Sequence, residues 1–314
     1  MMALMVAVYV LGSIPNALTY MFRPDSHSTY ENSHIPTRYN LIEDQGDSGS
    51  FWLCSFLTST TGKQYLALQH ILGSAGYSSI CKSFLPDLET KSYWNNLTTC
   101  EPVSHSSSNP IDIHLGSYGF GATSEDKISS LHAFNSVKDY SYDLTFEAKS
   151  KVLLNGGNGV ITFGQGFTNS TEWAIPALKT NGTFSVGKEK LQVDAAKSFT
   201  CIWAYDLAAP AVPTENRFAT IRFGEEAHLA LPYTLIASTT NVWRSDHRNV
   251  TYPLSWTFNF ENGDRLEVDS VRGDQEIYGG EQIGNTVYAG FIEAKGKFLG
   301  QHAGFGVVEM IQLW

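Results

Sequence analysis

Residues 171–206 constrain the fold more than any other segment of this chain. Apolar and polar residues alternate on both sides of Thr180-Asn181-Gly182-Thr183, and an aromatic run with Trp203, Tyr205 and Asp206 follows. Asn-Gly between alternating residues is the strongest short-range signal for a β-hairpin, because both residues tolerate a positive φ. We therefore expect two strands joined by a tight turn, and then a third strand. The aromatic and acidic residues that end the third strand indicate a binding cleft rather than plain core.

The rest of the chain repeats short alternating segments separated by turn residues. Residues 50–59 and 63–72 predict a hairpin around Thr60-Thr61-Gly62, and Glu261-Asn262-Gly263-Asp264 predicts another turn. No long segment keeps the apolar spacing i, i+3, i+4, i+7 of an amphipathic helix. The sequence therefore predicts an all-β protein, with further strands over residues 111–118, 139–149, 159–164, 217–223, 228–238, 251–260, 264–271, 286–294 and 302–312.

Length and composition fit two β domains. The chain has 314 residues, of which 13% are aromatic, and its 27 Gly and 11 Pro supply many turns. We expect an N-terminal β domain over residues 23–194 and a C-terminal β domain over residues 195–314, with a cleft between them. The formal net charge of −10 argues against nucleic-acid binding, which needs a basic surface. Small molecules are the expected partners.

The first 17 residues predict entry into the secretory pathway. They form an apolar run that ends in small residues and is too short for a stable membrane span, as in a signal peptide. Four Asn-x-Ser/Thr sequons favour the same route and predict glycosylation in a secreted or vesicular protein. The acceptor residues are Asn96, Asn169, Asn181 and Asn249.

The four cysteines fit no zinc site by their spacing, and they allow three pairings. Cys81 and Cys100 flank a polar loop that carries a sequon, so we expect a disulfide between them. Cys54 lies on an apolar strand and is expected to be a buried thiol. None of the four has the context of a catalytic nucleophile.

Two short motifs are better explained as local structure than as catalytic machinery. Gly46-Asp47-Ser48-Gly49 resembles the nucleophile loop of trypsin-like proteases. In those proteases the catalytic histidine and aspartate precede this loop, whereas here the motif precedes nearly every candidate histidine and aspartate. It is better explained as a polar turn. Glu225-x-x-His228 lies where a turn enters a strand, and side chains at i and i+3 of a strand point apart. The sequence also contains no HExxH, paired CxxC or Walker A motif. We therefore expect neither a metal nor a nucleotide cofactor.

His70 is the histidine with the most informative position. It ends a strand that is otherwise apolar on its face, beside the strand that carries Trp52. A hydrogen-bonded core histidine is an equal alternative. Trp173, Trp203, Trp243 and Trp256 are as compatible with core as with a pocket wall.

Three segments carry a resemblance to a known family. Residues 50–72, 172–193 and 287–310 resemble the opening hairpin, the strand pair and the closing Gly-spaced strands of the fungal kievitone-hydratase-like proteins, which are distant relatives of bacterial carotenoid hydratases. The resemblance spans most of residues 45–312. It implies two lipocalin-like β-barrel or β-sandwich domains with the active site between them.

Two departures from the family pattern bear on activity. The family's Trp-Tyr-Asp-Arg-Gln segment is replaced by residues 201–207, and its Tyr-Trp-Glu-Gly by Tyr288-Ala289-Gly290-Phe291, which removes a glutamate. Hydration of an alkene needs a well-placed proton donor. The resemblance therefore favours the hetero-Diels–Alderases of tropolonic sesquiterpene pathways, which join a tropolone-derived o-quinone methide to a humulene-type alkene without a cofactor.

The expected site follows from strand positions and this resemblance. We expect Trp52, His70, Trp203, Tyr205 and Trp256 around the cleft, with Tyr65 and Tyr288 as further substrate-binding residues. His70 or Tyr205 would donate to the quinone-methide oxygen, and Asp206 would orient that donor or assist dehydration of the precursor. The alternatives are a kievitone-hydratase-like hydro-lyase acting on a prenylated phenol and a lipocalin-like carrier without turnover.

Overall fold

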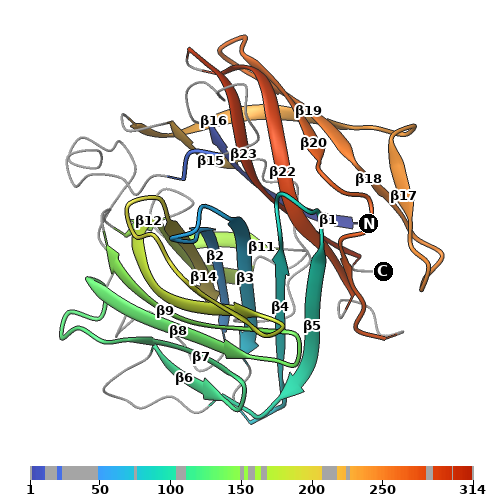
Figure 1. Cartoon of the computed structure of the whole chain (residues 1–314). Coiled ribbons are helices and arrows are strands. Elements are labelled where there is room, and N and C mark those ends of the chain that lie inside the picture. Colours follow the sequence, from blue (N-terminus) through green and yellow to red (C-terminus); the bar gives the residue numbers. More distant parts are fainter. Residues whose placement is uncertain are drawn as a thin grey trace. The chain divides into compact units, whose positions relative to one another are not determined.

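The computed structural model describes residues 2–10, 20–22, 49–73, 76–103, 111–148, 152–154, 160–163, 168–206, 218–223, 227–280, 286–298 and 300–312. Its regular elements over these residues are strands, as the all-β prediction requires (Figure 1). The chain divides into two compact units. The first unit is Phe22–Thr214, and the second unit combines Met1–Met21 with Glu215–Trp314.

The first unit is built on one antiparallel sheet of 13 strands. The order along the sheet is β5 (Tyr93–Cys100), β4 (Ser79–Pro86), β3 (Gln64–Gly73), β2 (Gly49–Thr58), β14 (Phe199–Asp206), β12 (Thr168–Val186), β9 (Tyr140–Ala148), β8 (Ser130–Ser136), β7 (Tyr118–Ala122) and β6 (Asp112–Leu115). Three short strands also pair with β12, namely β10 (Leu153–Leu154), β11 (Val160–Phe163) and β13 (Glu189–Gln192).

The tight turn predicted at residues 180–183 is wrong. β12 runs straight through Asn181-Gly182, and Gly182 lies opposite Leu144 of β9. Gly182 has φ +128°, and a Cβ there would lie 2.1 Å from the carbonyl oxygen of Asp143, so the glycine permits a close backbone approach inside a strand. The hairpin turn lies instead at Gly187-Lys188, where β12 turns into β13 and Gly187 has φ +57°. Only Gly182 adopts the positive φ expected of both residues, and it does so inside a strand.

Other predicted turns and strands agree better with the structure. Gly62 with φ +90° and Gly263 with φ +85° form the turns expected between β2 and β3 and between two strands of the second unit. Residues 111–118 divide into β6 and β7 around Gly116, which has φ +62°. The sequence analysis did not predict β4, β5 or β8.

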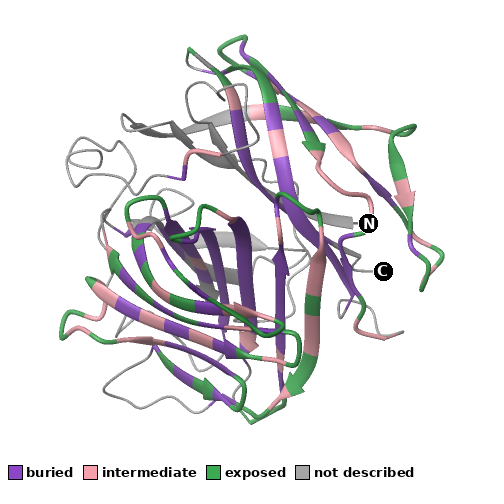
Figure 2. Ribbon diagram, in the orientation of Figure 1, coloured by how far each residue is buried: buried purple, intermediate pink, exposed green. Residues whose placement is uncertain are grey.

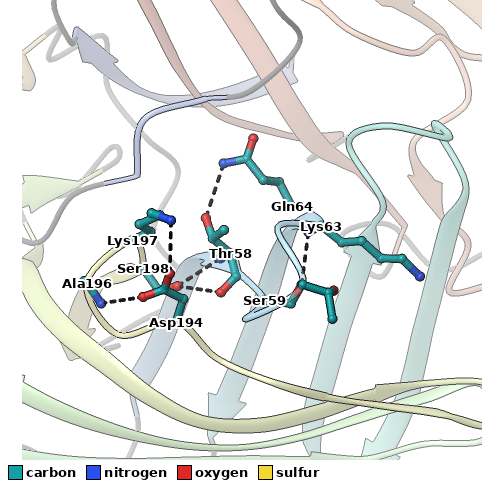
Figure 3. Close-up of polar contacts among 9 residues, drawn as sticks. Thr58, Ser59, Lys63, Gln64, Asp194, Ala196, Lys197 and Ser198 are labelled. Atoms are coloured by element: carbon teal, nitrogen blue, oxygen red, sulfur yellow. Dashed lines mark hydrogen bonds and ion pairs between the residues drawn. The ribbon is translucent and has the colours of Figure 1, made fainter.

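A hydrogen-bond cluster fixes one end of β2 (Figure 3). The backbone nitrogen of Thr58 donates to Ser198 Oγ at 2.9 Å, and the backbone nitrogen of Asp194 donates to the Thr58 carbonyl at 2.8 Å. Gln64 Nε2 from β3 donates to Thr58 Oγ1 at 3.3 Å. These contacts tie β3 and the segment that leads into β14 to the same end of β2, so they help to set the register of the three strands.

The second unit contains a sheet of eight strands that closes on itself. The order is β20 (Arg265–Ser270), β19 (Ser255–Phe260), β16 (Ala227–Ala237), β15 (Phe218–Phe223), β1 (Met2–Val10), β23 (Gln301–Gln312), β22 (Val287–Phe298) and β21 (Glu276–Ile277). An additional pairing of β20 with β22 closes the ring. The predicted strand over residues 251–260 divides into β18 (Thr251–Pro253), which pairs with β17 (Val242–Arg244), and β19.

Two boundaries were predicted for the organisation of the chain: the division between the two domains and the end of the leader segment. β14 lies between β2 and β12 in the first unit, so the units divide after Thr214 rather than near residue 195. Residues 2–10 form β1, which pairs with β23 over its whole length and with β15 at Tyr9 and Val10. A cleaved leader over residues 1–17 stays a prediction, and its removal would take β1 out of the ring.

The predicted disulfide and the predicted buried thiol are confirmed. Cys81 of β4 and Cys100 of β5 form a disulfide. Cys54 of β2 is a buried thiol, and burial raises its pKa well above its ordinary value. Cys201 of β14 lies directly opposite Cys54 in the sheet. Glycosylation of the four sequons stays a prediction.

Candidate functional site

Four side chains form a straight row across neighbouring strands of the first unit. Trp203 of β14 lies opposite Trp52 of β2, Trp52 lies opposite His70 of β3, and His70 lies opposite Lys82 of β4. Residues directly opposite in neighbouring strands share one face of the sheet, with Cβ atoms about 4.5–5.5 Å apart. We call these residues the aromatic–basic row.

The row occupies a face that ordinary alternation would leave in solvent. Phe51, Leu53, Ala67 and Ile71 of β2 and β3 belong to the apolar core cluster, so they face the opposite way from the row. Yet every residue of β2 and all but Leu72 of β3 are buried, as Figure 2 shows by their purple ribbons. The row is therefore a buried face of the sheet that carries polar groups, and we take it as the candidate site because charged and polar residues are uncommon in a plain apolar core.

His70 is held by a hydrogen bond to Ser50. The Ser50 Oγ and His70 Nε2 atoms are 2.8 Å apart, and both residues are buried. The hydroxyl and the imidazole nitrogen can each act as donor, depending on the tautomer. The bond fixes the ring's orientation, as a catalytic or ligand-binding imidazole requires. The structure thus shows the buried, hydrogen-bonded histidine of the alternative, and a role of His70 in the site stays a prediction.

The two tryptophans of the row pack on each other. Their ring centroids are 4.9 Å apart with an interplanar angle of 64°, an edge-to-face arrangement. Trp52 is buried and Trp203 half-buried. The Nε1 atom of Trp52 has no hydrogen-bond partner in the described part of the chain. Trp52 and Trp203, both predicted as substrate-binding residues, are therefore brought together beside His70.

Lys82 is the member of the row that the sequence analysis missed. Its side chain is only 2% exposed, although lysine is almost never fully buried in proteins. The sequence does carry a signal for it: Lys82 interrupts the apolar positions Ile80 and Phe84 on one face of β4. A charged residue at a core position of a strand is as informative a signal as the histidine at position 70.

Tyr205 and Asp206 are placed by register alone. Tyr205 pairs with Ser50, and Asp206 pairs with Gly49, at the end of β14. This puts the backbone of Tyr205 next to the strand position that supports His70. The structure describes nothing of these two side chains, so their predicted roles stay predictions.

Tyr65 lies on the other face of β3 from His70. It packs against Phe184 with ring centroids 5.1 Å apart and belongs to the core cluster. Burial raises its pKa to about 12, with nearby Asp87 adding to the effect. Tyr65 is therefore not brought to the aromatic–basic row.

Trp256 and Tyr288 both belong to the second unit and to its core cluster. Trp256 is buried, and its Nε1 atom also lacks a partner in the described part of the chain. The Tyr288 hydroxyl is 2.7 Å from Ser270 Oγ and donates to the Arg272 carbonyl at 2.9 Å. Burial raises the pKa of Tyr288. Neither residue is placed relative to the row.

Gly290, where the family pattern has a glutamate, is covered by an amide. A Cβ at Gly290 would lie 1.9 Å from Gln275 Oε1, so Gln275 fills the space that a side chain at position 290 would need. Gln275 is fully buried, and its Nε2 donates to Ser270 Oγ at 2.7 Å. The missing glutamate is thus replaced in space by a neutral group.

A buried carboxylate lies nearby in the second unit. Glu276 pairs with Tyr288 in the sheet and accepts hydrogen bonds from Ser245 Oγ at 2.7 Å and from the Tyr252 hydroxyl at 3.0 Å. The carboxylate and burial together raise the pKa of Tyr252, with burial as the larger cause. The sequence analysis did not identify Glu276, which follows a Gly-Asp-Gln stretch without a recognisable motif.

The lysine, histidine and tryptophan side chains of the row offer hydrogen-bond donors and aromatic surface. Within the described ranges, no group of three His, Cys, Asp or Glu residues is arranged to hold a metal ion.

No helix in the described ranges is long and apolar enough to cross a membrane. Gly46, Asp47, Ser48 and Glu225 lie outside the described residues.

Comparisons with known proteins identify relatives over nearly the whole chain. No protein-family model matches the chain. Kievitone hydratase of Fusarium solani subsp. phaseoli is 29% identical over 324 aligned positions, which cover 93% of this chain and 91% of that protein. The dehydratase asqC of Emericella nidulans is 30% identical over 339 positions, which cover 94% of this chain and 95% of that protein.

Solved structures give the same answer. The crystal structure of kievitone hydratase from Nectria haematococca matches with a TM-score of 0.83 and 28% identity, over 94% of this chain and 98% of that one. A protein of Nitrosomonas europaea described as AttH shares the fold, with a TM-score of 0.68 and 13% identity. Sequence and structure together place this chain in the kievitone-hydratase-like family of enzymes.

Proposed function

We propose that this protein is a cofactor-independent enzyme that forms and uses an o-quinone methide. Loss of water from a hydroxylated tropolone or phenol precursor would give the o-quinone methide. A hetero-Diels–Alder reaction with a humulene-type alkene would then form one C–C and one C–O bond. The observation that carries the proposal is the aromatic–basic row, in which two packed tryptophans are followed by a buried histidine and then a buried lysine.

The basic end of the row suits the oxygen chemistry of both steps. In the first step, the ring oxygen gives up a proton and the exocyclic hydroxyl leaves as water, so a donor must protonate the leaving group. In the second step, negative charge develops on the carbonyl oxygen of the diene. His70, held by Ser50, can serve as the donor, and Lys82 can stabilise the charged oxygen. One such donor is typically worth ~3 kcal/mol.

The aromatic end of the row suits the hydrocarbon partner. A macrocyclic alkene offers no polar handle, so its orientation depends on apolar walls such as Trp52 and Trp203. Holding the two reactants in a near-attack pose is worth up to roughly 7–11 kcal/mol. Neither step requires a nucleophile on the protein.

The decisive experiment measures product formation and stereochemistry. Purified protein is mixed with an o-quinone-methide precursor and humulene. We expect faster precursor loss and a single stereoisomer of the adduct. Yield and stereochemistry equal to those of the protein-free control would contradict the proposal.

The second candidate is a hydro-lyase that stops at the addition or removal of water on a prenylated phenol. The names of the two relatives, a hydratase and a dehydratase, favour it. Incubation in isotopic water separates the two, because a hydratase places solvent oxygen on a saturated prenyl carbon. The third candidate, a lipocalin-like carrier, would bind the ligand tightly and release it unchanged after long incubation.

A further inference from the structure

Trp52 carries a buried hydrogen-bond donor that no described residue accepts. The residue is 1% exposed, and its Nε1 atom has no partner among the residues that the structure describes. Buried polar groups in native proteins are paired in the large majority of cases, and an unpaired one costs stability. An indole N–H can donate but cannot accept, so whatever completes it must present an acceptor atom.

The position of this donor points to a ligand oxygen. Trp52 lies between His70 and Trp203 in the row, and Ser50, on the same face two residues earlier, is already bonded to His70. The hydrogen bond between Ser50 and His70 does not involve the indole N–H of Trp52, so that N–H is a further donor within the row. An apolar wall at this position would need no nitrogen, and phenylalanine would serve as well.

We propose that the Trp52 N–H donates a hydrogen bond to the oxygen of a bound tropolone- or phenol-type ligand. This assigns Trp52 as a specificity-determining residue rather than only a wall, and it rests on the proposed function for the class of ligand. The hydrocarbon partner has no acceptor, so the bond would tell the two reactants apart and fix which end of the cyclic ligand lies next to His70.

Indole N–H resonances test the assignment directly. The full-length protein is labelled with ¹⁵N in its 7 tryptophan side chains, and the Trp52 signal is identified as the one that Trp52→Phe removes. Tropolone is the oxygen-bearing probe, and azulene is the flat hydrocarbon control. We expect tropolone to move the Trp52 N–H signal downfield. Azulene has no oxygen to accept the hydrogen bond, so we expect no downfield shift of this signal with azulene.

Affinity provides a second readout. Trp52→Phe keeps an aromatic wall and removes the N–H, so tropolone affinity should fall about five- to tenfold while azulene affinity stays within twofold. The matched control is Trp94→Phe in β5, where the ring packs against the core cluster away from the row, and affinity for both probes should be unchanged.

The outcomes separate this inference from the proposed function. A Trp52 signal that moves with tropolone, in a protein that forms no adduct, supports the inference and removes the proposed reaction. A Trp52 signal that stays in place up to the solubility limit of tropolone overturns the inference, because a bound water or nothing then satisfies the N–H. Equal loss of affinity for tropolone and azulene in Trp52→Phe also overturns it.

Discussion

Two hairpins of the first unit, β2–β3 and β8–β9, differ in how many faces they bury. β9 alternates strictly, with Tyr140, Tyr142, Leu144 and Phe146 buried and the residues between them half-buried or exposed. β2 is buried at every position. A strand with one buried and one exposed face packs on the core with its buried side only. The second buried face of β2 and β3 is where the aromatic–basic row lies, so double burial distinguishes the hairpin that carries the proposed site.

Histidine substitutions offer the sharpest test of this difference. His70→Ala should lower turnover by about 10²–10⁴-fold, the range typical of a positioned proton donor. The matched control is His132→Ala in β8, whose imidazole bonds the exposed Asp143 carboxylate at 2.9 Å and should leave turnover unchanged. Steady-state rates of both variants, with their melting temperatures, check the prediction. Equal rates for the two variants would remove the functional distinction between the hairpins.

Lys82 should matter through its charge. Lys82→Met keeps an unbranched side chain and removes the ammonium, and we expect kcat to fall by about 10²-fold, equivalent to ~3 kcal/mol. Lys82→Arg should recover part of the loss. A merely structural lysine would lower the melting temperature of the methionine variant without changing kcat of the remaining folded protein, and rate measurements on that folded fraction decide between the two.

Core positions of the single-faced hairpin should show the reverse pattern. Phe146→Ala removes a buried ring from the core cluster and should cost about 3–5 kcal/mol in the free energy of unfolding. Product stereochemistry should not change, because Phe146 lies in β9, which carries no residue of the row. Denaturant unfolding and product analysis at a permissive temperature measure both. Altered stereochemistry would show that the two regions are not separable.

The core-facing side of the sheet in the first unit should be sensitive to alkali. Burial raises the pKa values of Tyr118, Tyr140 and Tyr142, whose hydroxyls bond Ser83 and Gln69. Folded-state pKa values above the unfolded value mean that stability is complete below about pH 10 and falls as the pH rises above it. Tyrosinate absorbance and circular dichroism should therefore change together. Tyrosinate formation well before unfolding would contradict the buried network.

The smallest effect concerns Cys54. Its buried thiol, with a raised pKa, should not react with iodoacetamide in the native protein at neutral pH. The same residue should be labelled quickly after denaturation, and mass spectrometry of the peptides measures both. Rapid labelling of native protein would show that the second face of β2 opens to solvent, which would weaken its comparison with β9.

The sequence by itself determined the strand-rich fold and much of the site. Alternation and turn residues placed β2, β3, β9, β20, β22 and β23, and the position of His70 beside Trp52 follows from the predicted hairpin. The Cys81–Cys100 disulfide was also predicted from the sequence, although the residues between the two cysteines form the hairpin of β4 and β5 rather than the expected polar loop. These features are local, and local backbone preferences and side-chain period decide them.

Only the tertiary structure decided which strands are neighbours and which faces are sheltered. β14 comes 141 residues after Thr58 at its first residue, Phe199, yet it pairs with β2 and brings Trp203 opposite Trp52. Asn181-Gly182 looked like a turn because the sequence shows its conformational freedom but not the approach of β9. The burial of Lys82 likewise depends on strands far away in the chain. Long-range pairing and burial have no local signature, since they arise from contacts that form only when the whole sheet assembles.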